Sequence, residues 1–451
     1  MNDIGKERES EFVDSLIRAF GSECVYHSPQ MRKANGQQKE LADAMILVPP
    51  YAVVFQLKWM HQTAEDFYGA NQEIERGRLW QKMVEAAKQF NRLNATWRRN
   101  SRIELPQIWN GGKKTFTLDL SLIKFFIPVV VVDFEDQQYT VPGARTNVCP
   151  VVTKIPNAIK DWGMVHCFLF RDFNTILADL FTPGDLITYL FLREKQIMVH
   201  QKFLNYSELD FFALYLTKYP EWNRSINSPM LVVEPNYYEA LIRDRADDFA
   251  KRREFFRNPD FLDEIVSQMC VHFQNKFCEA FLLNLGRIRG LPALIKKSIG
   301  EHVNINRKKL ECPNINITTT TQISMGRFAT MIFPNTLYLI GSVICESKCV
   351  ETVTDYLYRR ALSYIVEKGW QSDIQDVFMI IQGVPNRWTF AGGCTVNADD
   401  YDRCLTKVEI EKSRVNFDVE QFKASEWSYL RQFQENHGSA DNECDEVKST
   451  T

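Results

Sequence analysis

The chain has 451 residues, which is long enough for two or three domains. A hydrophobic fraction of 45% and an aromatic fraction of 12% predict packed cores and exclude a largely disordered protein. The formal net charge of −3 excludes a basic surface over the whole chain, although a local basic face remains compatible with it.

The sequence predicts neither membrane insertion nor export. The longest apolar runs, such as 125–132, have the length of a strand. The N-terminal residues are polar and do not resemble a signal peptide. Eleven scattered cysteines fit a reducing compartment, and their spacings lack the second pair that a zinc site needs. We therefore expect a cytoplasmic protein.

The first expected element is an amphipathic helix over 6–20. Its apolar stripe consists of Phe12, Val13, Leu16, Ile17 and Phe20. Glu9 lies three residues before Phe12 and falls on the same stripe. A carboxylate on a core-facing stripe needs a partner, because an unpaired buried charge is costly. Two interpretations stay open: Glu9 forms a salt bridge, or it takes part in a metal site.

A short strand at 24–27 and a polar loop over 28–39 are expected after this helix. The loop contains Arg32 and Lys33. Loops on a rigid sheet often contact partners. Arg32 and Lys33 are therefore candidate DNA contacts, and a simple solvated connection is the alternative.

Two apolar strands, 42–48 and 52–58, are expected to form an antiparallel hairpin. Pro49 and Pro50 mark the turn, because proline cannot donate to a strand ladder. A turn centred near Pro50 makes the numbers of paired residues sum to about 99–101. Asp43 then lies opposite 56–58.

Three polar residues consequently meet at the end of this apolar hairpin. Gln56 and Lys58 are two apart and point to one face of their strand. Burying these two side chains and Asp43 costs free energy, unless they pair with one another or bind a ligand. The plain interpretation is a cross-strand ion pair between Asp43 and Lys58.

A long helix is expected over 71–95. Its apolar stripe consists of Leu79, Met83, Ala86, Phe90 and Leu93. Lys82 and Gln89 border this stripe, and basic residues accumulate towards the end of the segment. Such residues either solvate a helix face or contact nucleic-acid phosphates, so Lys82 and Gln89 are candidate nucleic-acid contacts.

The rest of the chain predicts structure but no catalytic constellation. An edge strand at 115–120 and buried strands at 127–134 and 164–170 follow the long helix. Further helices are expected at 183–196, 207–218, 237–257, 262–285 and 291–301. A hairpin over 327–344, a helix over 350–368 and a strand over 377–382 follow, with Gly392-Gly393 as a turn. We expect four regions: a first domain at 1–180, a helical region at 181–315, a small α/β module at 316–433, and a disordered tail at 434–451.

Asp43 and Lys58, separated by fourteen residues, resemble the core motif of the PD-(D/E)xK nuclease superfamily. Gln56-Leu57-Lys58 is similar to the QxK variant of Mrr-like restriction endonucleases, and Ala42 stands where the family usually has proline. The predicted order of helix, three strands, helix and strand resembles the αβββαβ core of the superfamily. The first helix of that core commonly carries an active-site glutamate, which matches Glu9.

This resemblance implies a mixed α/β (α+β) fold with a restriction-endonuclease-like core, and the activity of a metal-dependent DNA endonuclease. Asp43, Gln56, Glu9 and the Leu57 carbonyl are the implied ligands of Mg²⁺, for which Mn²⁺ would substitute. Lys58 would orient the attacking water. Restriction or anti-phage defence is an expected setting, and a homo-oligomer is compatible with it. The alternatives are a catalytically inactive nuclease fold that binds nucleic acid or assembles with partners, and an interaction protein without a nucleic-acid role.

Overall fold

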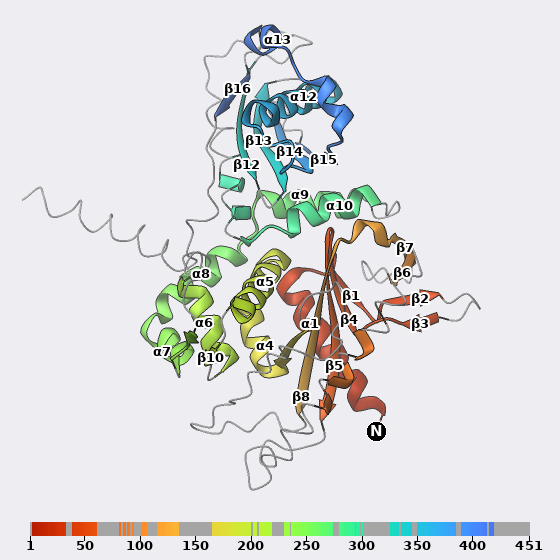
Figure 1. Cartoon of the computed structure of the whole chain (residues 1–451), viewed down its shortest axis with the longest axis vertical. Helices are drawn as coiled ribbons and strands as arrows, with labels where there is room; N and C mark the ends of the chain where they lie inside the picture. Colours follow the sequence, from red (N-terminus) through yellow and green to blue (C-terminus); the bar gives the residue numbers. More distant parts are fainter. Residues whose placement is uncertain are drawn as a thin grey trace, which may run out of the picture. The chain divides into compact units, whose positions relative to one another are not determined.

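The chain divides into two compact, interleaved units in the computed structural model (Figure 1). Unit 1 consists of Met1–Asn258, Phe273–Ala293 and Ser425–Thr451, and unit 2 of Pro259–His272 and Leu294–Ala424. The structure describes residues 2–32, 38–60, 81–82, 84–86, 88–90, 93, 102–106, 115–134, 165–199, 202–204, 207–218, 230–234, 236–273, 279–293, 295–297, 299–301, 303, 325–332, 335–344, 350–384, 389–412 and 415–418.

A mixed five-stranded sheet forms the core of unit 1, with the strand order β1-β4-β5-β8-β9. The strands are β1 (Val25–His27), β4 (Ala44–Val48), β5 (Tyr51–Met60), β8 (Phe125–Phe134) and β9 (His166–Leu169). Neighbours from β1 to β5 are antiparallel, whereas β5, β8 and β9 are parallel. Since β8 lies between two parallel neighbours, its run of valines is buried on both faces, as predicted.

The hairpin register agrees with the prediction from the proline turn. Ala44 pairs with Phe55 and Val48 pairs with Tyr51, so that paired residue numbers sum to 99. Asp43 directly precedes β4 and continues the alignment, because its backbone N–H donates to the Phe55 carbonyl at 3.1 Å.

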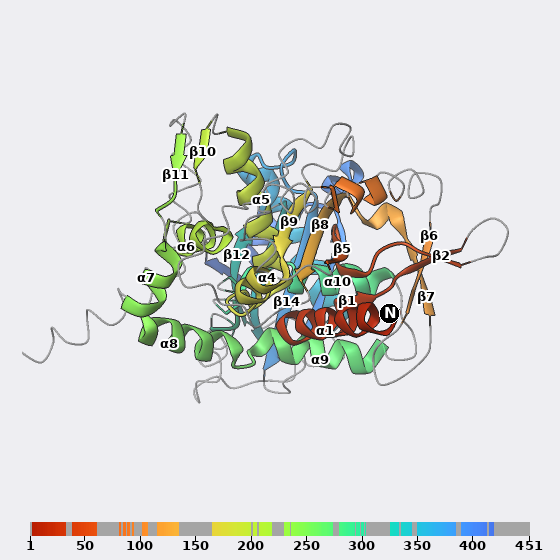
Figure 2. The ribbon, with the colours of Figure 1, turned by 90° about the horizontal axis from the view of Figure 1, so that it is seen from below.

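Helices α1 (Asn2–Phe20) and α4 (Phe170–Leu177) pack beside one another on the sheet of unit 1 (Figure 2). The ring of Phe12 lies 5.3 Å from that of Phe55 and 5.9 Å from that of Phe173, between centroids. The strand expected at 164–170 is shorter than predicted, because Phe170 is the first residue of α4.

A second sheet in unit 1 corrects the prediction of a loop at 28–39. That segment contributes β2 (Gln30–Arg32) and β3 (Gln38–Glu40) to a sheet of order β3-β2-β6-β7. The other strands are β6 (Arg102–Pro106) and β7 (Thr115–Asp119), and β7 lies at the predicted edge. Short polar strands give no apolar alternation in the sequence and were missed for that reason.

The middle of the chain is mainly helical, as expected. Unit 1 contains α5 (Pro183–Val199), α6 (Glu208–Lys218), α7 (Tyr237–Asp244), α8 (Ala246–Arg257) and α10 (Glu279–Arg289), with β10 (Lys202–Leu204) and β11 (Met230–Val232) paired in parallel. The helix predicted over 237–257 is broken at Arg245, whose φ of −133° leaves the helical region. The helix predicted over 262–285 is two helices, α9 (Phe261–Phe273) and α10.

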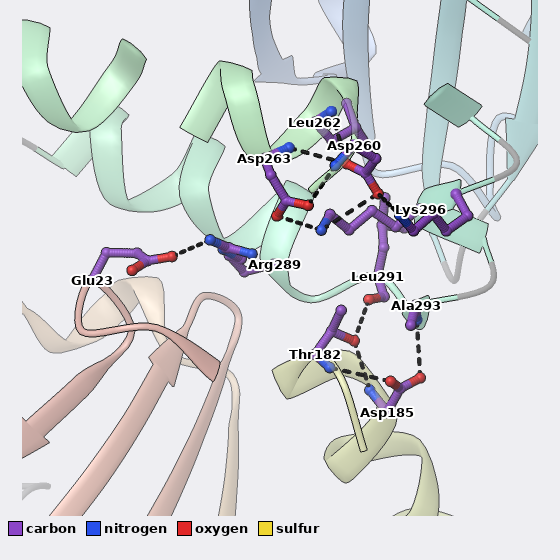
Figure 3. A network of polar contacts seen from close by, with 11 residues as sticks. Glu23, Thr182, Asp185, Asp260, Leu262, Asp263, Arg289, Leu291, Ala293 and Lys296 are labelled. Carbon is purple, nitrogen blue, oxygen red and sulfur yellow. Dashed lines mark hydrogen bonds and ion pairs between the residues drawn. The ribbon is translucent and has the colours of Figure 1, made fainter. Parts of the chain in front are cut away.

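A buried polar clamp joins the start of α5 to the turn after α10 (Figure 3). The Asp185 carboxylate accepts hydrogen bonds from the backbone N–H of Thr182 at 3.1 Å and of Ala293 at 2.9 Å. The Thr182 hydroxyl donates to the Leu291 carbonyl at 2.7 Å. These hydrogen bonds therefore connect two segments that are more than one hundred residues apart in the chain.

An ion pair buried within unit 1 connects α5 to α6. Arg193 and Glu208 are 1% and 2% exposed, and two guanidinium nitrogens of Arg193 reach the carboxylate at 2.8 and 2.9 Å. Tyr189 donates to the same carboxylate at 2.5 Å. Burial and the Arg193 charge lower the pKa of His166 well below its usual range, so the neutral ring accepts a hydrogen bond from Arg193 at 3.2 Å.

Unit 2 contains a sheet of order β15-β14-β13-β12-β16. Its strands are β12 (Met325–Ile332), β13 (Thr336–Ile344), β14 (Asp376–Val384), β15 (Thr389–Thr395) and β16 (Val415–Asp418). The expected hairpin of β12 and β13 and the helix α12 (Val350–Lys368) are present, and α12 links the parallel strands β13 and β14. The prediction of a turn at Gly392-Gly393 is wrong, because both residues pair with β14 inside β15. A side chain at Gly393 would collide with the Val377 carbonyl, which explains the glycine there.

Helix α9 is tied to the segment after α10 within unit 2. Asp260 caps α9 by accepting from the backbone N–H of Leu262 at 2.9 Å, and Lys296 reaches Asp263 at 2.5 Å and Asp260 at 3.5 Å (Figure 3). In the part of the chain that the structure describes, no helix is long and apolar enough to cross a bilayer.

Candidate active site

The end of the β4–β5 hairpin fixes the Asp43 carboxylate. Its Oδ2 accepts a hydrogen bond of 2.5 Å from the backbone N–H of Leu57. The N–H and C=O of one strand residue point to the same edge of the strand. The Leu57 carbonyl therefore faces the side of β5 on which Asp43 lies.

Lys58 is held by the long helix, part of which is described between 81 and 93. Ala86, Phe90 and Leu93 are buried and confirm the predicted stripe. This packing places Gln89, whose side-chain oxygen accepts a hydrogen bond of 3.0 Å from the Lys58 ammonium group. Gln89 is thus a positioning partner of Lys58.

Glu9 approaches the site from another element. Phe12 packs on Phe55, which points to the opposite face of β5 from Lys58, so α1 covers that opposite face. The Glu9 carboxylate nevertheless raises the pKa of Asp43, and Lys58 lowers the pKa of Glu9. Glu9 therefore belongs to the electrostatic environment of Asp43 and Lys58.

Glu40, at the end of β3, is a further acidic residue of the site that the sequence reasoning missed. Its charge raises the pKa of both Glu9 and Asp43. Glu40 is exposed, whereas Asp43 and Glu9 are half-buried. A carboxylate three residues before Asp43 was the available signal, but the sequence reasoning gave Glu40 no role.

Burial determines the protonation behaviour of the site. It raises the pKa of Asp43 from 3.8 to about 6, against the opposing effects of the Leu57 N–H and the Lys58 charge. It also raises the pKa of Glu9 and lowers that of Lys58. The Lys82 charge lowers the pKa of Lys58 further. Nearby carboxylates with raised pKa values and an ammonium group with a lowered one are typical of functional sites.

Gln56 lies deeper than the other motif residues. It is 7% exposed, and its side-chain nitrogen donates to the Leu41 carbonyl at 3.4 Å. Its place two residues before Lys58 puts both side chains on one face of β5, as predicted.

The candidate DNA contacts have different outcomes. Lys82 and Gln89 are exposed on the helix beside Lys58, and Lys82 lies 3.3 Å from the Glu85 carboxylate. Arg32 lies in β2, but its side chain is outside the described part of the structure, as is Lys33.

The donor atoms of the site suit a hard divalent cation. Asp43 offers a carboxylate oxygen, and its burial together with the charges of Glu9 and Glu40 leaves an excess of negative charge that a cation would offset. Among the described residues, no three His, Cys, Asp or Glu side chains form a group that can bind one ion together. Mg²⁺ commonly uses only one or two carboxylates and keeps several waters, so the donor set is compatible with it.

Comparison with known proteins adds no family. No family model, no curated protein and no solved structure matches this chain. The function of the site must therefore be argued from its own residues.

Asp43→Asn is expected to stabilise the protein at neutral pH without bound metal. The native pKa of about 6 exceeds the ordinary value of 3.8, so the native state retains a proton that the unfolded chain releases. This carboxylate thus lowers stability as pH rises from about 4 to 6, by up to about 3 kcal/mol. Asparagine removes that effect and can still accept the Leu57 N–H.

Urea unfolding of both proteins in chelator, between pH 4 and 8, measures this difference. The variant should gain stability over the wild type as pH rises, with the gap closing near pH 4. A gap that is independent of pH, or that widens towards acid, would contradict the raised pKa.

Proposed function

We propose that unit 1 is a metal-dependent nuclease of the PD-(D/E)xK type with a restriction-endonuclease-like core, which hydrolyses phosphodiester bonds in DNA. The observation that carries this proposal is the placement of Asp43 and Lys58 across one hairpin end, where Asp43 has a pKa raised to about 6 and the pKa of Lys58 is lowered. Without the strands of the second sheet, the elements follow in the order α1, β1, β4, β5, helical residues within 81–93, and β8. This order supports the proposal, because it is the αβββαβ order that the resemblance implies.

The residues take different roles in this proposal. Asp43, the Leu57 carbonyl and Glu9 would hold Mg²⁺ or Mn²⁺, and Glu40 would add negative charge nearby. The bound ion would neutralise phosphate charge and acidify water. Lys58, fixed by Gln89, orients the attacking water at its Nζ and offsets charge on the phosphate. Gln56 is buried, and its hydrogen bond to the Leu41 carbonyl supports the base of the hairpin.

A second function is supported by a specific observation. Gln56 donates to a backbone carbonyl, and the described residues contain no group of three acidic or other metal-binding side chains. A nuclease fold that binds DNA without cleaving it would have this arrangement. Restriction or anti-phage defence stays our proposal for the biological setting of either function.

Mg²⁺ is expected to stabilise the wild-type protein, because an ion that binds only the native state raises its stability with concentration. At one hundred times its dissociation constant the gain is about 2.7 kcal/mol. Thermal unfolding at pH 7.5, with Mg²⁺ from 0 to 20 mM (roughly the range for weak sites), measures it without DNA or activity.

Asp43→Asn should lose this response, and Asp247→Asn, an exposed acid on α8, should keep it. A wild type that does not respond to Mg²⁺ or Mn²⁺, or an equal response in Asp43→Asn, would argue for the second function.

A further inference from the structure

Three aromatic rings form a cluster at the surface of unit 1, away from the candidate active site. Tyr51 and Phe125 begin the paired strands β5 and β8 and are register partners. Their rings are stacked, with centroids 5.2 Å apart and an angle of 22°. Phe191, on α5, stands at 68° to Tyr51 and at 89° to Phe125. We call Tyr51, Phe125 and Phe191 the aromatic platform.

Two of the three platform rings are exposed to solvent, and Tyr51 is half-buried. Phe125 is 45% exposed and Phe191 is 39% exposed, although both contact neighbouring rings. Clustered exposed aromatics in a folded protein mark binding surfaces more often than single exposed residues do. Their right-angled arrangement offers a flat ligand one ring to stack on and one to meet edge to face.

Two exposed lysines lie close to platform residues along the chain. Lys124 directly precedes Phe125, and Lys195 lies one helical turn after Phe191 on the same face of α5. Half-buried Glu194 lies beside Lys195. Aromatic rings flanked by cations are the combination that binds single-stranded nucleic acid, with bases stacked on the rings and phosphates near the cations.

We propose that the aromatic platform binds single-stranded DNA by base stacking. This inference rests on the proposed nuclease function for its choice of DNA and extends it to the form of the substrate. Tyr51 shares its strand face with Phe55 and not with Lys58, and seven residue steps of β5, or about 23 Å, separate Tyr51 from Lys58 along the strand. The platform is therefore a binding surface separate from the candidate active site.

Fluorescence anisotropy with a labelled oligo(dT) 20-mer and a 20-base-pair duplex tests the platform, with chelator present so that no cleavage occurs. The double variant Phe125→Leu/Phe191→Leu keeps apolar surface but loses the stacking faces. Its dissociation constant for oligo(dT) should rise at least about tenfold, because each stacked base contributes about 1–3 kcal/mol. Its duplex affinity should stay within about twofold.

Matched controls separate this result from general surface effects. Phe255→Leu changes a phenylalanine on α8 that is 37% exposed, and it should bind oligo(dT) as the wild type does. Lys124→Gln/Lys195→Gln should weaken oligo(dT) binding and reduce its dependence on salt.

Three outcomes would contradict binding of single-stranded DNA by the platform. The wild type does not bind oligo(dT), the leucine variant binds it with equal affinity, or the leucine substitutions change only the molecular mass measured by light scattering. The last would identify a self-association surface. Failure of the nuclease proposal has a different signature, because the wild type would then bind oligo(dT) through the platform without cleaving DNA in Mg²⁺. Cleavage that depends on Asp43 with oligo(dT) binding unaffected by the leucine variant would reject the platform alone.

Discussion

Replacement of Asp43 or Lys58 by alanine should abolish Mg²⁺-dependent DNA cleavage, with a loss in rate of at least about 10²–10³-fold. Asp43 supplies the half-buried carboxylate that the Leu57 N–H holds in place. Lys58 supplies the charge that Gln89 positions. DNA affinity should change little, because phosphate contacts are distributed over many residues. Plasmid and linear DNA cleavage in Mg²⁺, Mn²⁺ and chelator measures the first effect, and anisotropy in chelator measures the second.

Further variants separate chemistry from folding in this experiment. Asp43→Asn keeps an acceptor for the Leu57 N–H and should be as inactive as Asp43→Ala. Gln56→Glu removes the donor to the Leu41 carbonyl and adds a buried charge, so it should lower the stability of the protein in chelator. Asp247→Ala and Lys251→Ala, two exposed residues on α8, should cleave as the wild type does. Cleavage that persists in chelator or in Asp43→Ala would show that the Asp43–Lys58 pair is structural.

Arg193→Ala should destabilise unit 1 by about 3–5 kcal/mol, which is the usual effect of removing one partner from a buried ion pair. The substitution leaves Glu208 with an uncompensated charge at 2% exposure and removes the donor to His166. It also removes the guanidinium group that lies 4.7 Å from the ring centre of Phe168. Urea unfolding, followed by circular dichroism, measures the loss.

A double variant distinguishes charge from packing in that pair. Arg193→Met/Glu208→Leu removes both charges and keeps apolar volume, so it should regain much of the stability lost in Arg193→Ala. Arg243→Ala, which removes an exposed partner of Asp244, should change stability by less than about 1 kcal/mol. An Arg193→Ala variant that unfolds like the wild type would contradict the importance of the buried pair.

The hairpin part of the site was predictable from the sequence because its determinants are local. The prolines at 49 and 50 set the turn, strand alternation fixed the face shared by Gln56 and Lys58, and the observed register followed. The helical stripe around Phe90 was likewise predictable, and it placed Gln89 beside Lys58.

The features that were missed leave no local hydrophobic pattern in the sequence. Glu40 ends β3, a short polar strand that pairs with β2 and shows no apolar alternation. Gly393 belongs to a strand because β14 approaches closely, which no local pattern reveals. The break at Arg245 interrupts a segment whose composition favours one continuous helix, and that segment contains neither the glycine nor the proline that would have indicated a break.

The interleaving of the two units has a consequence for how this protein can change over generations. The chain passes from one unit to the other four times, after Asn258, His272, Ala293 and Ala424. A gene rearrangement with a single breakpoint therefore cannot add or remove unit 2 as a cassette, since every such cut separates α10 from strand β4, which it contacts, or divides unit 2 itself. The two units must be inherited together, and insertions are tolerated best within exposed loops inside either one.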